Sequence, residues 1–83
     1  MTDGKGNNMT EHNLRRYWEI YNAYWDIFKK YTAKFEDTNA YWQCLLHEAD
    51  AVHQTFKPVN KDLSYYLALA TVEAVRHEYR KVQ

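Results

Sequence analysis

Glycine, proline and cysteine are scarce in this chain of 83 residues, which holds two glycines, one proline and one cysteine. The glycines are Gly4 and Gly6, and the proline is Pro58. A meander of short strands needs turn residues throughout its length, so this distribution argues against one. A glycine loop that cradles phosphate is excluded as well, because no glycine follows Gly6.

Long apolar runs and an excess of charge of one sign are also missing. No stretch approaches the roughly 18 apolar residues of a membrane span, and the first eight residues lack the charged-then-apolar order of a signal peptide. Eleven basic and eleven acidic residues cancel, so general attraction to nucleic acid or to anionic membranes is not indicated. Cys44 alone cannot form an intrachain disulfide, and its apolar neighbours predict a buried thiol. We therefore expect a cytoplasmic protein.

Aromatic residues, at 17% of the chain, are the abundant class. Between residues 10 and 35 apolar side chains recur at alternating intervals of three and four, which predicts an amphipathic helix capped by Thr10. YWEIY at 17–21 recurs seven residues later as YWDIF at 24–28, so similar faces stack along this helix. The predicted seam is Leu14, Tyr17, Tyr21, Tyr24, Phe28, Tyr31 and Phe35, flanked by Trp18 and Trp25 on one side and by Ile20 and Ile27 on the other.

Two further helices are predicted after breaks in the apolar pattern. Residues 36–39 supply cap residues for a helix over about 40–56, and Pro58 then disfavours helix at Lys57. Asn60 can cap a third helix over roughly 61–81. Short connections make neighbouring helices antiparallel, so the expected fold is an all-α, up-down-up three-helix bundle.

The predicted single domain covers residues 10–83 and follows a flexible lead-in over residues 1–9. The stretch 63–75 is apolar on nearly every side, with only Ser64, Thr71 and Glu73 as polar interruptions. A helix that is apolar all round is normally surrounded. The third helix is therefore either central, or covered in part by a second chain, in which case oligomerisation completes the bundle.

The spacing of histidines and carboxylates argues against a metal site. The two histidines in the stretch 47–53 are six apart, whereas a zinc-protease helix needs them four apart. Asp50 with His53, and Glu73 with His77, could each form half of a carboxylate-bridged site. Antiparallel pairing about the proline break separates these halves by more than a helical turn, so a solvated face is the preferred interpretation.

Nucleophilic catalysis is not predicted either. Cys44 and His47 could touch on a helix surface, but a competent pair needs an exposed thiolate, an orienting third group and an oxyanion site. The chain beyond Gly6 has no glycine-bearing turn to build such a site. The sequence therefore predicts no enzyme activity and no cofactor.

Basic residues end the first and third predicted helices. In an up-down-up bundle both groups share one pole, where they could contact nucleic acid or an acidic partner. The helix dipole favours such cations at any helix C-terminus, and Glu36, Asp37 and Glu78 dilute the patch. Nucleic acid is the weaker prediction for a neutral chain. The residues are Lys29, Lys30, Lys34, Arg76, Arg80 and Lys81.

Tyrosine dominates the seam of the first helix, where leucine or isoleucine would pack more simply. A buried tyrosine needs a partner for its hydroxyl, and tyrosine and tryptophan are the residues that anchor interfaces. We therefore predict a small protein–protein interaction domain that self-associates or docks on another protein. The candidate protein-binding residues are Trp18, Tyr21, Tyr24, Trp25, Tyr65 and Tyr66.

The second half of the chain resembles small helical proteins encoded by phages and mobile elements of gut Firmicutes. The resemblance rests on YWQCLLHEADAVHQTF at 41–56 and DLSYYLALATVEAVRHEYRK at 62–81. It implies an accessory protein of a mobile element, and such proteins often bind a host enzyme. An anti-CRISPR-like inhibitor that blocks a host defence enzyme sterically is therefore the alternative function, and the resemblance assigns no functional residues.

Overall fold

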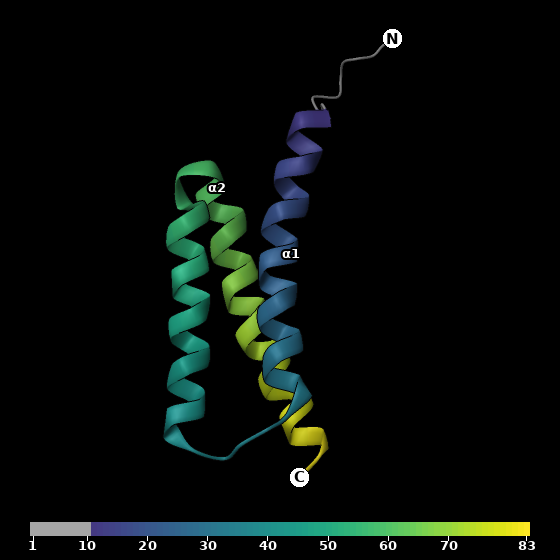
Figure 1. Ribbon diagram of the computed structural model, residues 1–83, viewed down its shortest axis with the longest axis vertical. Coiled ribbons are helices and arrows are strands. Elements are labelled where there is room, and N and C mark those ends of the chain that lie inside the picture. The colour runs from purple at the N-terminus through teal and green to yellow at the C-terminus, as the bar shows by residue number, and fades with distance from the viewer. Residues whose placement is uncertain (1–10) are drawn as a thin grey trace.

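The chain is all-α, and the computed structural model describes its residues 11–83 (Figure 1). Helix α1 spans Glu11–Ala33 and helix α2 spans Asn39–Lys81; no strand occurs in the described range. The predicted lead-in over 1–9 and the predicted cap Thr10 lie outside the described residues. Within 11–83 no helix is long and apolar enough to cross a membrane.

Helix α2 folds back on itself at Asn60. The backbone there has φ −158° and ψ 89°, which is not helical, while the segments on both sides are. The ribbon reverses at this point, so the first arm (residues 39–59) and the second arm (residues 61–81) run antiparallel (Figure 1). The helices predicted over 40–56 and 61–81 are thus the two arms of one element. Over residues 11–83 there are two helices where the sequence predicted three.

The first arm of α2 continues further than the sequence predicted. Helical backbone continues past Phe56 and through Pro58, up to Asn60. A proline only disfavours helical backbone at the residue before it. The Asn60 side chain, in contrast, can accept a hydrogen bond from a backbone N–H that has no partner at the start of a helix. Its Oδ1 accepts a hydrogen bond from the backbone N–H of Leu63 at 3.2 Å. The predicted cap at Asn60 is confirmed, and the turn belongs to the asparagine rather than to the proline.

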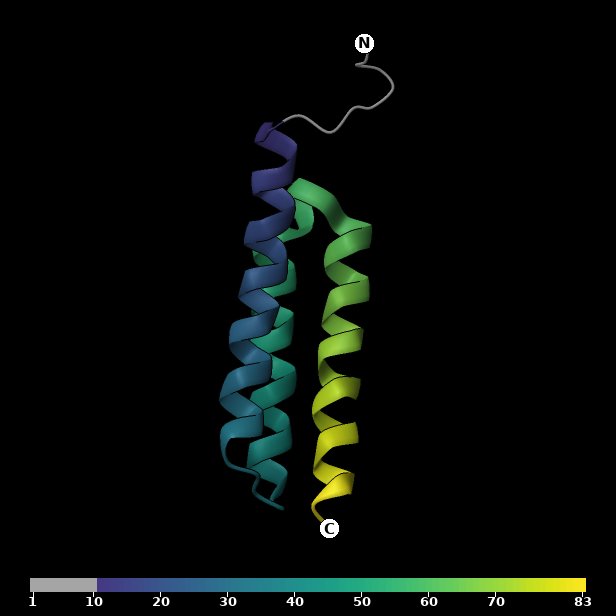
Figure 2. The same ribbon diagram turned by 90° about the vertical axis from the view of Figure 1, so that its right-hand side faces the viewer.

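The core lies where α1 faces both arms of α2, which run beside it in Figures 1 and 2. On α1 the core takes the side that carries Ile20 and Ile27, so the predicted seam is rotated and Leu14 and Tyr21 are exposed. Isoleucine carries no hydroxyl that needs a partner, which favours burial of this side. The buried apolar residues are Ile20, Tyr24, Ile27, Tyr31, Tyr41, Leu45, Ala49, Val72 and Val75.

The second arm of α2 is not central, contrary to one of the two predicted arrangements. Its polar interruptions Ser64 and Thr71 are buried, whereas Tyr65, Tyr66 and Leu69 are exposed. The Thr71 hydroxyl donates to the backbone carbonyl of Leu67 at 2.7 Å, so its burial leaves no orphaned donor. The arm therefore turns hydroxyls inward and keeps a large apolar face at the surface.

Aromatic rings tie the three helical segments together at the pole where α1 ends, α2 begins and the chain terminates (Figure 1). Tyr31 of α1 and Tyr41 of the first arm lie edge to face at 5.3 Å between centroids. Trp42 of the first arm and Tyr79 of the second arm do the same, also at 5.3 Å. Edge-to-face pairs add stability beyond their buried area, so this pole is the well-anchored end of the molecule.

Candidate protein-binding surface

The exposed side of α1 carries an aromatic stripe. Trp18, Tyr21 and Trp25 are 63%, 54% and 52% exposed, and Leu14 continues the stripe toward the start of the helix. The four residues are spaced by four, three and four, which places them on one line along the helix. This is the spacing of a coiled-coil seam, and it lies beside the seam that faces the core. The chain therefore displays a second helix-packing seam at its surface.

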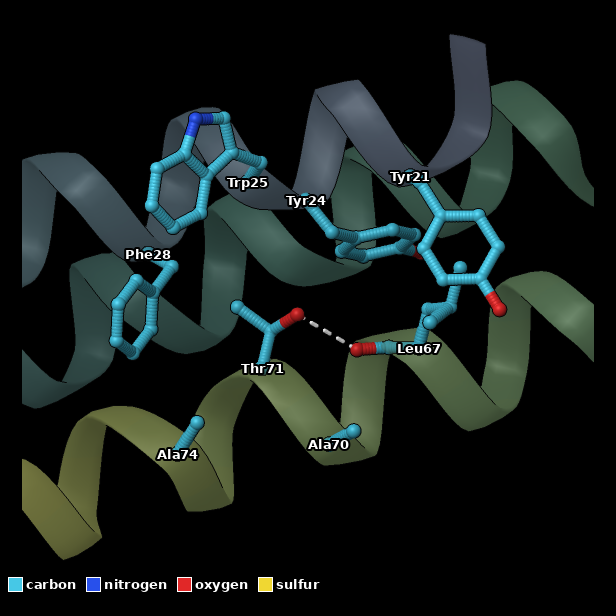
Figure 3. Close-up of a pocket in the computed structure, with 8 residues that line it drawn as sticks. All are labelled: Tyr21, Tyr24, Trp25, Phe28, Leu67, Ala70, Thr71 and Ala74. Carbon is cyan, nitrogen blue, oxygen red and sulfur yellow. Dashed lines mark hydrogen bonds between the residues drawn. The ribbon is translucent and has the colours of Figure 1, made fainter. Parts of the chain in front are cut away.

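The stripe borders an open groove between α1 and the second arm, drawn in Figure 3. The groove has a volume of about 240 Å³. Ala70 and Ala74 form a shallow side on the second arm, and Trp25 stacks on Phe28 along α1 with 5.7 Å between ring centroids. We call this hollow the aromatic groove; it is lined by Tyr21, Tyr24, Trp25, Phe28, Leu67, Ala70, Thr71 and Ala74.

The aromatic groove suits apolar contact rather than chemistry. The Thr71 hydroxyl is occupied by its bond to the Leu67 carbonyl, drawn as a dashed line in Figure 3. Among residues 11–83, no charged side chain lines the groove. Alanines on the second arm face aromatic rings on α1 across the groove. The space above the alanines can accommodate bulky side chains of another helix. The groove can therefore bind an apolar helix face.

Tyr24 was predicted to be one of the protein-binding residues, but it is buried. It is only 3% exposed, and its ring forms part of the inner wall of the aromatic groove. Its hydroxyl lies 2.9 Å from the hydroxyl of Ser64 in the second arm. Burial raises the pKa of Tyr24, and the charge of Asp50 adds to the rise, while the Ser64 hydrogen bond offsets part of it. Tyr24 thus supports the groove from within the core.

Tyr65 and Tyr66 are exposed, as the docking prediction requires, but Tyr65 borders a different hollow. This second hollow, of about 190 Å³, lies between the two arms of α2, with His53 and Leu69 among its lining residues. The Tyr65 ring lies 6.0 Å from that of Tyr66 and 6.1 Å from that of His53. The structure thus brings Trp18, Tyr21 and Trp25 together and places Tyr65 on another side of the second arm.

Ser64 is the buried polar residue whose role the sequence analysis missed. It is fully buried and contacts both the Tyr24 hydroxyl and, at 3.1 Å, Nδ1 of His53. A serine beside a histidine can be a nucleophile, but full burial keeps this hydroxyl from any substrate. The antiparallel pairing of the arms could have revealed it, because a hydroxyl on an apolar face opposite His53 needs a partner there.

Cys44 is exposed, so the predicted burial of its thiol is wrong. The first arm turns Tyr41, Leu45 and Ala49 toward the core, and Cys44 points about 100° away from Leu45 around the helix. In the described part of the chain, no group of three histidine, cysteine or acidic side chains is placed to hold a metal ion.

The basic residues lie near the ends of α1 and α2, which adjoin where Phe35 contacts Tyr79. Acidic residues neutralise most of them. Lys30 reaches across to Glu48 of the first arm at 2.6 Å. The other three pairs lie within one helix: Lys29 with Asp26, Arg76 with Glu73 and Lys81 with Glu78. Lys34 and Arg80 take part in none of the ion pairs within residues 11–83. The pole therefore offers two unneutralised cations in the described range, which weakens the case for a phosphate-binding patch.

Comparison of the chain with protein-family models, with curated proteins and with solved structures finds no match.

Proposed function

We propose that this chain is a protein-interaction domain that binds an α-helix in the aromatic groove. The single observation that carries the proposal is the second seam on α1, where Trp18, Tyr21 and Trp25 lie exposed in a line beside an apolar hollow. Tryptophan and tyrosine are the residues that dominate binding energy at interfaces. Scattered exposed apolar residues need no explanation, but a continuous patch of this kind marks an interaction site.

In this proposal α1 and the two arms of α2 act as an up-down-up three-helix bundle that a fourth helix completes. Coiled-coil spacing on the exposed side of α1 provides one surface for that helix. Ala70 and Ala74 on the second arm provide the other, because small side chains let a neighbouring backbone approach closely. In the alternative function, the chain sterically blocks a host defence enzyme. That enzyme would have to present a helix to the same groove.

The experiment is a selection of helix-forming peptides from a displayed library, followed by measurement of the dissociation constant with the purified chain. We expect selected peptides to carry large apolar residues at helical spacing. Trp18→Ala with Trp25→Ala should weaken binding at least tenfold, since each removes an interface anchor. Ala70→Arg should weaken it similarly by filling the groove.

The matched control is Tyr65→Ala, because Tyr65 is as exposed as Trp25, at 52%, but lines the other hollow. Binding to this variant should stay within threefold of wild type. Circular dichroism of each variant shows whether the helices remain folded. The proposal is contradicted if no helical peptide is enriched, or if Tyr65→Ala weakens binding as much as the two tryptophan substitutions do.

A further inference from the structure

The geometry points to a second copy of this chain as the occupant of the aromatic stripe, with the two α1 helices packed antiparallel about a two-fold axis at the level of Ile20. This inference rests on the proposed function, because it names the helix that the surface binds. Trp18 would then face Tyr21 of the second copy, and Leu14 would face Trp25. A two-fold interface uses the same patch on both copies, so the patch must be complementary to itself.

The charges beside the stripe have this self-complementary order. Four of the charged residues on this flank of α1, Glu11, Arg15, Asp26 and Lys29, run negative, positive, negative and positive. Glu19 lies between them, close to the level of the axis, and Asp26 also pairs with Lys29 within α1 at 3.3 Å. Read from Lys29 back to Glu11, the same four charges run positive, negative, positive and negative. Each charge is therefore opposite in sign to the one at the same position of the forward order. Antiparallel pairing about Ile20 therefore sets Glu11 opposite Lys29 of the second copy, and Arg15 opposite Asp26. All four residues are exposed at the flank of the stripe.

The stripe is also large enough to form the centre of a dimer interface. An aromatic side chain offers about 150–250 Å² of surface, and the three rings are between 52% and 63% exposed. Two copies would together bury roughly 700 Å² from these rings alone. The smallest specific interfaces bury about 1,200 Å², and Leu14, the groove and the charged flank supply the rest. The zero net charge adds no repulsion between copies.

The first test is the native mass by light scattering after size-exclusion chromatography, over a wide range of protein concentration. We expect twice the chain mass at high concentration and dissociation on dilution. Trp18→Ala with Trp25→Ala should raise the dissociation constant of the dimer at least tenfold. A chain that stays monomeric up to millimolar concentration overturns the inference. The proposed function survives that result if the groove still binds a helical peptide, and fails if it binds neither.

Two charge reversals test the antiparallel orientation. The first variant carries Glu11→Lys and Arg15→Glu, and the second carries Asp26→Lys and Lys29→Glu. Each variant alone places like charges across the two-fold axis and should dimerise at least tenfold more weakly at low salt. Mixed in equal amounts, they present opposite charges at every place, so a mixed dimer of wild-type affinity should form.

The control reverses an ion pair of the same spacing outside α1, with Glu73→Arg and Arg76→Glu. This variant should dimerise within threefold of wild type. Sedimentation equilibrium on each variant and on the mixture gives the constants. Recovery in the mixture supports the antiparallel two-fold pairing. Equal weakness of the mixture and of the separate variants overturns it.

Discussion

The hydroxyl groups of Tyr24 and Ser64 meet in the core at 2.9 Å and join α1 to the second arm of α2 across 40 residues of sequence. His53 of the first arm completes the network through Nδ1, 3.1 Å from the same serine oxygen. One fully buried side chain thus links all three helical segments. Apolar packing drives association but is not directional, so this network fixes how the segments are rotated against one another.

Ser64→Ala is expected to destabilise the fold by about 1–3 kcal/mol, because it leaves the buried Tyr24 hydroxyl without its partner. Tyr24→Phe should cost only about 1 kcal/mol, since Ser64 can keep its bond to His53. The double variant should cost less than the sum of the two, and the difference measures their coupling. Urea unfolding of the four proteins provides the cycle. Strictly additive costs would show that the two hydroxyls do not interact.

Alkaline pH is expected to destabilise the fold through its buried tyrosines. Burial raises the pKa of Tyr24, Tyr31 and Tyr41 above the ordinary 10.0 because a phenolate loses its hydration in the core. The unfolded chain therefore releases these protons at a lower pH than the folded chain does. Stability should fall as the pH rises above 10.0 and through the higher folded-state pKa values. Urea unfolding at pH 8 and at steps above pH 10 measures the change; a constant or rising free energy of unfolding would contradict it.

The helices and their caps could be predicted from the sequence because both depend on local pattern. Thr38 caps α2 by accepting a hydrogen bond from the Tyr41 amide at 3.1 Å, and Asn60 caps the second arm. The direction in which α1 faces could not be predicted. Apolar residues cover more than half of its circumference, so the stripe with Trp18 and the seam with Ile20 are equally good core faces by periodicity alone.

The burial of Ser64 and Thr71 could not be predicted from the sequence either. A hydroxyl in an apolar run counts as an interruption, yet Thr71 satisfies its own donor through the carbonyl four residues earlier. Ser64 finds its partners on segments that are distant in sequence. Only the packed arrangement shows that these small residues leave room for the arms to approach, which turns Tyr65 and Tyr66 outward. The exposure of Tyr65 and Tyr66 is therefore a consequence of how the arms pack.

Substitutions on opposite sides of α1 test which seam is the core. Ile20→Ala removes a fully buried side chain and should cost about 2–5 kcal/mol. Trp18→Ala removes a larger side chain that is mostly exposed, so its cost should stay within about 0.5 kcal/mol in the monomer. The free energies are measured by chemical unfolding at a concentration where the chain is monomeric. A larger loss for Trp18→Ala than for Ile20→Ala would mean that the predicted seam, not the rotated one, faces the core.

Glu48 is expected to make the fold sensitive to acid. Partial burial acts to raise the pKa of its carboxyl, but hydrogen bonds from Lys30 and Tyr31 and the charge of Lys30 outweigh burial and lower it below 4.5. The stabilisation is therefore complete above pH 4.5, where the unfolded chain is also ionised. It should be lost as the pH falls below 4.5 and through the lower folded-state pKa.

Glu48→Gln removes this dependence as well as the ion pair that joins α1 to the first arm. We expect a loss of about 1 kcal/mol at pH 7, since one amide oxygen cannot replace a carboxylate toward both donors. Between pH 5 and pH 3 the variant should lose less stability than wild type does. The control Glu19→Gln changes an exposed carboxyl on α1 about three turns away from Lys30 and should keep the wild-type acid profile. If Glu48→Gln keeps that profile too, the acid sensitivity arises from other carboxyls, and the bonds to Lys30 and Tyr31 add nothing to stability in solution.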